Sequence, residues 1–345
     1  MQTRERKIKI LKAVVEEYIR SGEPVGSKLL CSTLGFPVSS ATVRNEMSEL
    51  SDMGLLTQVH TSAGRQPSEE GFRFYVEKLM EPKTLSASVK GRIYEELHRR
   101  ADDPEQLLKA ASDVVSDILN TVCICTTPFS EDARIHTLKF VQTGRQTCMA
   151  VLITSTGLIK TRLFKCDYII TPDIVHIYET ILNREMEGIP VKSVTPAYVQ
   201  TLAVGMGEIA MLIPSVLAAV MDACRDVSGF SMTVKGRAKL LSSLLTGGDP
   251  EQLRTLTTLL HSDEQLEMLM FKLRSGQKYL IGADTGTAVL RDYSFLAEPY
   301  NLEPTSGGFI TVIVPMRFDY AYGAAVLGCT AECTGRLMKE ILMIE

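Results

Sequence analysis

The first part of the chain alternates short amphipathic helices with polar turns. Apolar side chains recur at helical spacing from Ile8 to Ile19, which predicts a helix with a basic start, and the turn Ser-Gly-Glu-Pro at residues 21–24 ends it. A second, shorter helix is predicted up to about residue 35, with Ser27 as its N-cap. Two helices with a tight polar connection are therefore expected before residue 36.

A third helix is predicted after the Phe-Pro-Val turn at residues 36–38, with Ser39 or Ser40 as its N-cap. Its apolar stripe comprises Val43, Met47 and Leu50. A strand is expected over residues 55–59, followed by a polar loop at 60–66 and a helix that starts near Ser68. Three helices followed by a strand and a loop indicate a winged helix-turn-helix, in which the third helix enters the major groove of DNA.

The side of this third helix opposite the apolar stripe is polar. At 100° per residue it carries Ala41, Arg44, Asn45 and Ser48. Three-helix bundles also serve as interaction modules, and a solvated helix face is the alternative interpretation of these residues. The glycine-containing loop with Arg65 favours DNA, because a wing of this kind lies along the backbone or in the minor groove. The candidate DNA-binding residues are Ser39, Ser40, Thr42, Arg44, Asn45, Ser48, Thr61, Ser62 and Arg65.

The pattern changes after residue 80. Residues 81–103 are polar and charged and are expected to connect the DNA-binding domain, residues 1–80, to the rest of the chain. From residue 104 an amphipathic helix and four apolar runs with short turns predict an α+β domain with an antiparallel sheet.

Residues 188–248 interrupt this pattern of helices and strands, which resumes at 249–345. They are punctuated by proline and contain a long apolar helix at 202–225. The helix is apolar on more faces than a surface helix, which suggests a subunit interface. We expect a mostly helical insertion between a first part of the α+β domain at 104–187 and its second part.

Composition narrows the class of protein. A chain of 345 residues suggests two or three domains, and 45% hydrophobic residues is typical of a globular protein. The net charge of −4 argues against a protein that coats nucleic acid over its whole surface, but it leaves room for a local DNA-binding face. The longest apolar run, residues 209–221, is shorter than the about 20 residues that span a bilayer, so no membrane association is expected.

The eight cysteines lie in apolar surroundings without a CxxC pair or a signal peptide, which indicates reduced thiols and a cytoplasmic protein. Cys123 and Cys125 would share a strand face, and Cys329 and Cys333 a helix face, so a thiolate metal site is the alternative to four small hydrophobes. The five histidines fall in different elements, and no nucleotide-binding or hydrolase motif is present. We expect no enzyme, no metal and no cofactor, with a metal-dependent enzyme as the alternative.

Three stretches carry a specific resemblance: EPVGSKLL, VSSATVRNEMSELSDMGLL and HTSAGRQPSEEGFRFYVEKL. They closely resemble the N-terminal domain of the bacterial heat-inducible transcription repressor HrcA family. The later ASDVVSDILN, YLIGAD, SFLAEPY and GGFITVIVPMRFDY resemble the same family, so the likeness extends over essentially the whole chain. It implies a winged-helix domain, a GAF-like domain and a dimerisation domain inserted into the latter.

The resemblance also implies a function. It implies a homodimeric repressor of heat-shock chaperone operons that binds an inverted-repeat operator in double-stranded DNA and whose activity the GroE chaperonin supports. The alternative is a winged-helix regulator controlled by a small ligand in the GAF-like domain.

Overall fold

The N-terminal end of the chain folds into a three-helix bundle with a short β-ribbon. The computed structural model describes residues 3–58, 64–130, 132–205, 213–244, 250–274, 277–303 and 306–342. The bundle and ribbon consist of α1 (Thr3–Ser21), α2 (Ser27–Thr33), α3 (Ser40–Asp52), β1 (Leu56–Thr57) and β2 (Gln66–Pro67). β1 and β2 pair in antiparallel fashion, and the chain continues into α4 (Glu69–Phe74) and the π-helical turn η1 (Tyr75–Leu79). We call residues 3–79 the N-terminal module.

The apolar stripe of α3 is confirmed, because Val43, Met47 and Leu50 are all buried in the module core. Ser39 is confirmed as the N-cap of α3. The cap predicted for α2 is wrong: Gly26 occupies that position without a side-chain cap, and Ser27 is the first helical residue. The Ser27 hydroxyl lies 2.9 Å from that of Ser40 instead, so it joins the starts of two helices.

The segment after the N-terminal module is only in part a connector. Helix α5 (Ala87–His98) packs against α6 (Pro104–Leu119) and α13 (Tyr320–Leu342), with Ile93 and Leu97 fully buried. The prediction that residues 81–103 merely connect two domains is therefore wrong for α5. Its two buried residues, one turn apart, were outweighed by the charged positions around them.

A central antiparallel sheet organises the middle of the molecule. Its strand order is β8-β3-β11-β10-β9, and β4 pairs with β11. The strands are β3 (Val122–Thr126), β4 (Phe129–Ser130), β8 (Met232–Lys235), β9 (Tyr279–Ile281), β10 (Tyr293–Glu303) and β11 (Ser306–Pro315). Because β3 pairs with β11 and with β8, segments far apart in the sequence complete one sheet.

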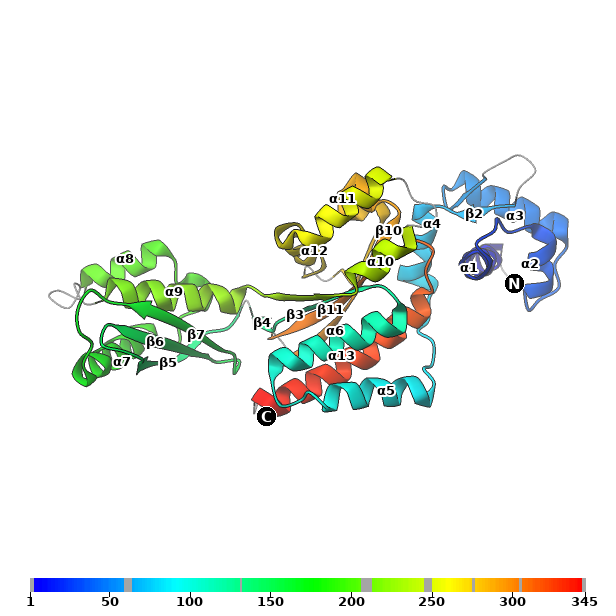
Figure 1. Cartoon of the computed structure of the whole chain (residues 1–345). Coiled ribbons are helices and arrows are strands. Elements are labelled where there is room, and N and C mark those ends of the chain that lie inside the picture. The colour runs from blue at the N-terminus through cyan, green and yellow to red at the C-terminus, as the bar shows by residue number, and fades with distance from the viewer. Residues whose placement is uncertain are drawn as a thin grey trace.

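Helices cover both faces of this sheet. Alternate residues of β3 point to opposite faces, so Cys123 and Cys125 pack toward α6 and α13, whereas Val122 and Ile124 pack toward the second helical layer. That layer consists of α10 (Arg237–Leu244), α11 (Pro250–His261) and α12 (Asp263–Arg274). Two short 3₁₀ turns, η4 (Gly282–Thr285) and η5 (Ala288–Leu290), lie between β9 and β10. The result is the three-layer domain at the centre of Figure 1, which we call the central domain.

A second, three-stranded antiparallel sheet lies apart from the first. Its order is β5-β6-β7, with β5 (Ile135–Gln142), β6 (Thr147–Thr154) and β7 (Ile159–Lys165). It belongs with α7 (Pro172–Met186), η2 (Val191–Ser193), α8 (Pro196–Gly205) and α9 (Pro214–Ser228). The chain therefore leaves the central sheet after β4 and returns at β8, so the excursion spans residues 131–231 and not 188–248 as predicted. We call these residues the insertion.

The long apolar helix expected at residues 202–225 is also a wrong prediction. Two helices, α8 and α9, occupy this region, and residues 206–212 lie outside the described residues. The apolar side of α9 is buried within its own chain, where Val216, Val220 and Val227 lie in the core that α9 forms with the small sheet. The apolar character that suggested a subunit interface is thus explained by packing inside one chain.

The fold class is α+β, as predicted, since helices and antiparallel sheets combine in one chain. The N-terminal module and the insertion lie at opposite ends of an elongated molecule, with the central domain between them (Figure 1). Among the described residues, no helix combines the length and the apolar character needed to cross a membrane.

Candidate nucleic-acid interface

The first turn of α3 carries the hydroxyl groups that the sequence pointed to. Ser39 has extended backbone angles, and its Oγ accepts a hydrogen bond from the Thr42 amide at 3.1 Å. The Ser39 and Thr42 hydroxyls lie 2.8 Å apart, and the Ser40 hydroxyl lies 2.9 Å from Ser27. The remaining N-terminal amides and the helix dipole make this end of α3 electropositive.

The outer side of α3 is polar and open to solvent. Ala41, Arg44 and Asn45 are exposed, and Ser48 is half-buried. We call these four residues the α3 outer face. Within the described residues, the Arg44 guanidinium and the Asn45 amide have no side-chain partner. Both groups are therefore available to a ligand, and in double-stranded DNA they match base edges and phosphate oxygens.

The inner side of α3 is held to α1 by charged groups. Glu46 is 4% exposed, and its Oε1 accepts from Arg6 Nε at 3.0 Å and also from Arg6 Nη2. One turn further on, Glu49 pairs with Lys7. Two of the basic residues at the start of α1 thus serve internal ion pairs. The sequence carried a signal for this arrangement, because Glu46 lies inside the apolar stripe, where an acidic residue needs a partner.

The β-ribbon is anchored to the segment between α1 and α2. Arg65 and Val25 exchange backbone hydrogen bonds of 2.8 and 2.9 Å. Gly64 is required beside this bridge, since a Cβ at that position would lie 2.4 Å from the Val25 carbonyl oxygen. Arg65 is half-buried, and its guanidinium forms no ion pair in the part of the chain that is described. The candidate residues Thr61 and Ser62 lie outside the described residues.

The returning strand leads directly into a capped helix. Ser68 Oγ accepts from the Gly71 amide at 3.0 Å and donates to the Gly54 carbonyl. A Cβ on Gly71 would lie 2.0 Å from the Leu55 carbonyl oxygen, so α4 approaches the ribbon as closely as only glycine allows. Gly64 and Gly71 were present in the sequence as loop and helix glycines, but their close contacts depend on the three-dimensional fold.

The thiolate metal site considered above lacks a full set of ligands among the described residues. In the described ranges, no group of three or more His, Cys, Asp or Glu side chains is arranged to hold a metal ion. Cys123 and Cys125 do share a strand face, and burial raises the pKa of the Cys123 thiol well above its ordinary value. A buried thiol of this kind is a poor nucleophile and a poor metal ligand.

The family model and two similar curated proteins point to the same family. Residues 105–322 match the family described as HrcA protein C terminal domain. The heat-inducible transcription repressor HrcA of Laribacter hongkongensis is 31% identical, with 98% of this chain and 96% of that protein covered. The repressor of the same name from Alkaliphilus metalliredigens is 26% identical, with 98% and 99% covered.

A solved structure shares the overall fold. The crystal structure of a hypothetical protein, determined at 2.2 Å resolution, superimposes with a TM-score of 0.56 and 21% sequence identity, and 97% of this chain and 98% of that chain are covered. At this level of identity the likeness concerns the fold alone.

Proposed function

The chain belongs to the HrcA family of heat-inducible transcription repressors, and we propose that it represses heat-shock chaperone operons by binding an inverted-repeat operator as a homodimer. The observation that carries this proposal is the α3 outer face, where Arg44 and Asn45 are exposed and unpaired while the opposite side of the same helix is buried. An arrangement of three helices and a β-ribbon is that of a winged helix, in which the third helix reads the major groove.

In this proposal α3 lies in the major groove with its N-terminus toward the phosphate backbone. Arg44 and Asn45 contact base edges or the adjacent phosphates, and Ser48 lies one turn further along the same face. Ser39 and Thr42 share one hydrogen bond between their hydroxyls, so one of the two hydroxyl hydrogens remains for a phosphate oxygen. The dipole of α3 and the Ser40 hydroxyl add to the attraction of this end of the helix for phosphate.

The β-ribbon supplies a second contact. Because its backbone is fixed to Val25, Arg65 occupies a defined place at the start of the returning strand. We propose that its guanidinium contacts the backbone or enters the minor groove, together with Thr61 and Ser62. Contacts of this kind position a domain on the duplex and carry little sequence information.

The helix α9 covers one face of the small sheet and leaves the other face open. We assign the dimer contact to this open face. In register across the three strands, Val141 pairs with Met149 and Met149 with Leu163. Leu163 is 67% exposed, Ile159 52% and Val141 48%. We call this surface the outer sheet face; its apolar members are Val141, Met149, Val151, Ile153, Ile159 and Leu163. A contiguous apolar surface of this kind is typical of a subunit interface, and a two-fold contact matches an inverted repeat.

Support by chaperonin is the part of the proposal that rests on family membership. In it, free GroE chaperonin sustains the active repressor, and heat diverts chaperonin to unfolded proteins. Operator binding by the purified repressor should then rise when chaperonin and ATP are added, and it should fall again when an unfolded client protein is added in excess.

A gel shift tests the central claim. The probe is an inverted repeat from the promoter of the organism's own chaperonin operon, and the control is a duplex of equal length with both half-sites scrambled and the spacer retained. A specific repressor should bind the repeat on the order of 10³-fold more tightly than the control at physiological salt. Equal affinity for both duplexes would remove sequence-specific repression as the function.

A further inference from the structure

Two segments that stand out in the sequence, SEEGFRF at residues 68–74 and YLIGAD at 279–284, meet where the N-terminal module joins the central domain. Arg73 of α4 donates from Nε to Asp284 Oδ2 at 3.1 Å and from Nη2 to Asp284 Oδ1 at 3.0 Å. This is a two-pronged guanidinium–carboxylate pair, whose geometry fixes direction as well as distance. It joins residues 211 positions apart in the sequence.

A second carboxylate reinforces the pair. Glu69 Oε1 accepts from Arg73 Nη2 at 3.0 Å and from the backbone amide of Ala283 at 2.8 Å. Asp284 Oδ2 in turn accepts from the Ile281 amide at 3.0 Å, which holds the carboxylate against its own turn. Each of these two carboxylates thus binds both the guanidinium and a backbone amide in the η4 turn or directly before it.

The backbone of the central domain is shaped for this contact. Gly282 has a φ of +54°, and a Cβ there would lie 2.5 Å from Cδ of Glu69. Only glycine combines that conformation with so close an approach. The glycine of the IGAD sequence is therefore explained by the neighbouring module. We call the bonds among Arg73, Glu69, Asp284 and Ala283 the α4–η4 contact.

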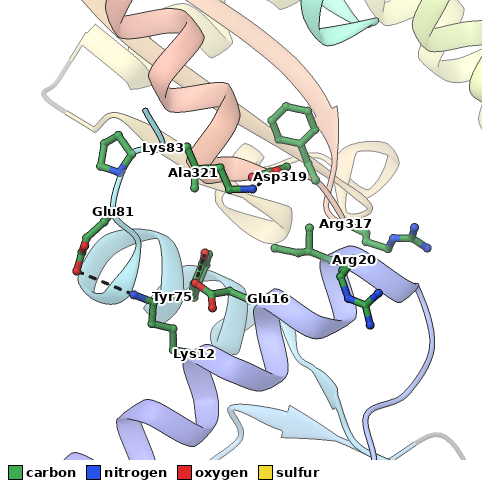
Figure 2. Close-up of a pocket in the computed structure, with 12 residues that line it drawn as sticks. Lys12, Glu16, Arg20, Tyr75, Glu81, Lys83, Arg317, Asp319 and Ala321 are labelled. Carbon is green, nitrogen blue, oxygen red and sulfur yellow. Dashed lines mark hydrogen bonds and ion pairs between the residues drawn. The ribbon is translucent and has the colours of Figure 1, made fainter. Parts of the chain in front are cut away.

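A cleft of about 720 Å³ separates α1 from the start of α13, lined by charged side chains that include Lys12, Glu16 and Arg317 (Figure 2). Beside the cleft, Lys83 forms an ion pair with Asp319 at 2.6 Å. The rings of Phe72 and Tyr320 also meet across the junction, with centroids 6.1 Å apart. The ring contact is buried and adds apolar packing, but an exposed lysine pair resists rotation weakly. The two-pronged pair fixes direction as well as distance.

We propose that Arg73 and Asp284 position the α3 outer face relative to the central domain and thereby select the spacing between the two half-sites of the operator. The inference rests on the proposed dimeric operator binding. In a dimer held together by the insertion, the two N-terminal modules are at a fixed separation only if each is held at a fixed angle. Neither residue touches DNA in this arrangement, so both are positioning residues.

The test compares spacer discrimination in the full-length protein. Affinity is measured for the inverted repeat and for the same repeat with 5 base pairs added to the spacer, which turns one half-site by about half a helical turn. The variants are Arg73→Gln and Asp284→Asn. The control is Arg99→Gln, which removes an exposed pair with Glu96 on α5. Amide exchange of residues 281–285 in the free protein reports whether the contact opens.

We expect the wild-type protein and the Arg99 variant to bind the lengthened repeat at least about tenfold more weakly than the native one. In both α4–η4 variants this ratio should fall toward 1, and exchange at Ala283 should accelerate. A general loss of folded protein would weaken binding to both duplexes equally and leave the ratio of the two affinities unchanged. The ratio therefore separates an effect on positioning from an effect on stability.

Two results overturn the inference. One is full spacer discrimination in variants whose Ala283 amide exchanges faster, and the other is unchanged exchange in both variants. If the wild-type protein binds the repeat no better than scrambled DNA, the proposed function fails instead. The exchange measurement still decides in that case whether the contact holds the module.

Discussion

The ion pair between Arg6 and Glu46 offers a quantitative test of how α3 is held. Glu46 is 4% exposed, and its Oε2 has no hydrogen-bond partner. Lys7 lies close enough to interact with its charge, but among the described residues only Arg6 forms an ion pair with it. The substitution Arg6→Met removes that partner and leaves a carboxylate in an apolar core. Breaking a buried pair in this way costs about 3–5 kcal/mol. The Arg6 side chain is 28% exposed, and partial screening by water lowers the expected cost to about 2–3 kcal/mol.

Amide exchange measures this cost where it arises. At about 1.4 kcal/mol for each tenfold change, the amides of α3 should exchange about 30 to 150 times faster in the Arg6→Met protein, whereas those of α13 should be unaffected. The matched control is Arg99→Met at the C-cap of α5, which breaks an exposed pair with Glu96 and should change exchange by less than about threefold. The double variant Arg6→Met with Glu46→Leu should recover most of the protection, because an apolar pair needs no charged partner.

The reasoning is refuted by either of two results. If Arg6→Met leaves exchange of α3 within about threefold of the wild-type rate, the pair contributes no more than an exposed one. If the double variant is less protected than the single variant, the carboxylate of Glu46 stabilises the module in a way that does not depend on Arg6.

Three further predictions address DNA contact, assembly and the ribbon. Arg44→Ala should cost about 1–3 kcal/mol of DNA-binding free energy and relax specificity at one base pair. Arg65→Ala should weaken binding to all sequences alike and lower the slope of log K against log salt concentration by about 1. The opposite pattern in competition gel shifts would exchange the roles of the two residues. Leu163→Glu should yield monomers by light scattering, whereas the control Ala218→Glu, on the exposed side of α9, should not. A Leu163 variant that remains dimeric would exclude the outer sheet face as the dimer interface. Gly64→Ala should speed exchange of the Arg65 amide at least about fivefold, and an unchanged rate would mean that the ribbon tolerates a Cβ.

The sequence was most informative where local periodicity determines structure. The stripe of Val43, Met47 and Leu50 and the cap at Ser39 follow from spacing and side-chain chemistry within one helix, and both are confirmed. A pattern within one helix does not determine which side chain of another element will pack against it. The partner of Glu46 and the close contacts of Gly64 and Gly71 therefore became visible only in the folded module.

The predicted boundaries of the insertion were wrong for a related reason. Strands β3, β5, β6 and β7 are close in sequence, with only the two-residue β4 between the first two, and this spacing favours a single sheet. In the structure β3 pairs with β8 and β11 instead, which come much later in the chain. Alternation of polar and apolar residues identifies a strand but not its partner, since the same pattern serves either sheet. The apolar character of α9 was ambiguous in the same way, because burial within a chain and burial between chains need the same residues.

The elongated arrangement has a consequence for operator recognition. The α3 outer face and the outer sheet face belong to parts of the molecule at opposite ends (Figure 1), so a small rotation at any junction between them moves the N-terminal module by a large amount. One junction is the α4–η4 contact. The other is the return of the insertion to the central sheet, where the Thr127 amide donates to the Ser231 carbonyl at 2.8 Å and the Ser231 amide donates to Thr127 Oγ1 at 2.9 Å. In the proposed dimer, two half-sites must be met about 34 Å apart or at multiples of that distance, so we expect residues at these junctions to influence which operator is bound. Variants made to test the proposed specificity of this protein should therefore include Arg73, Asp284 and Thr127 as well as Arg44.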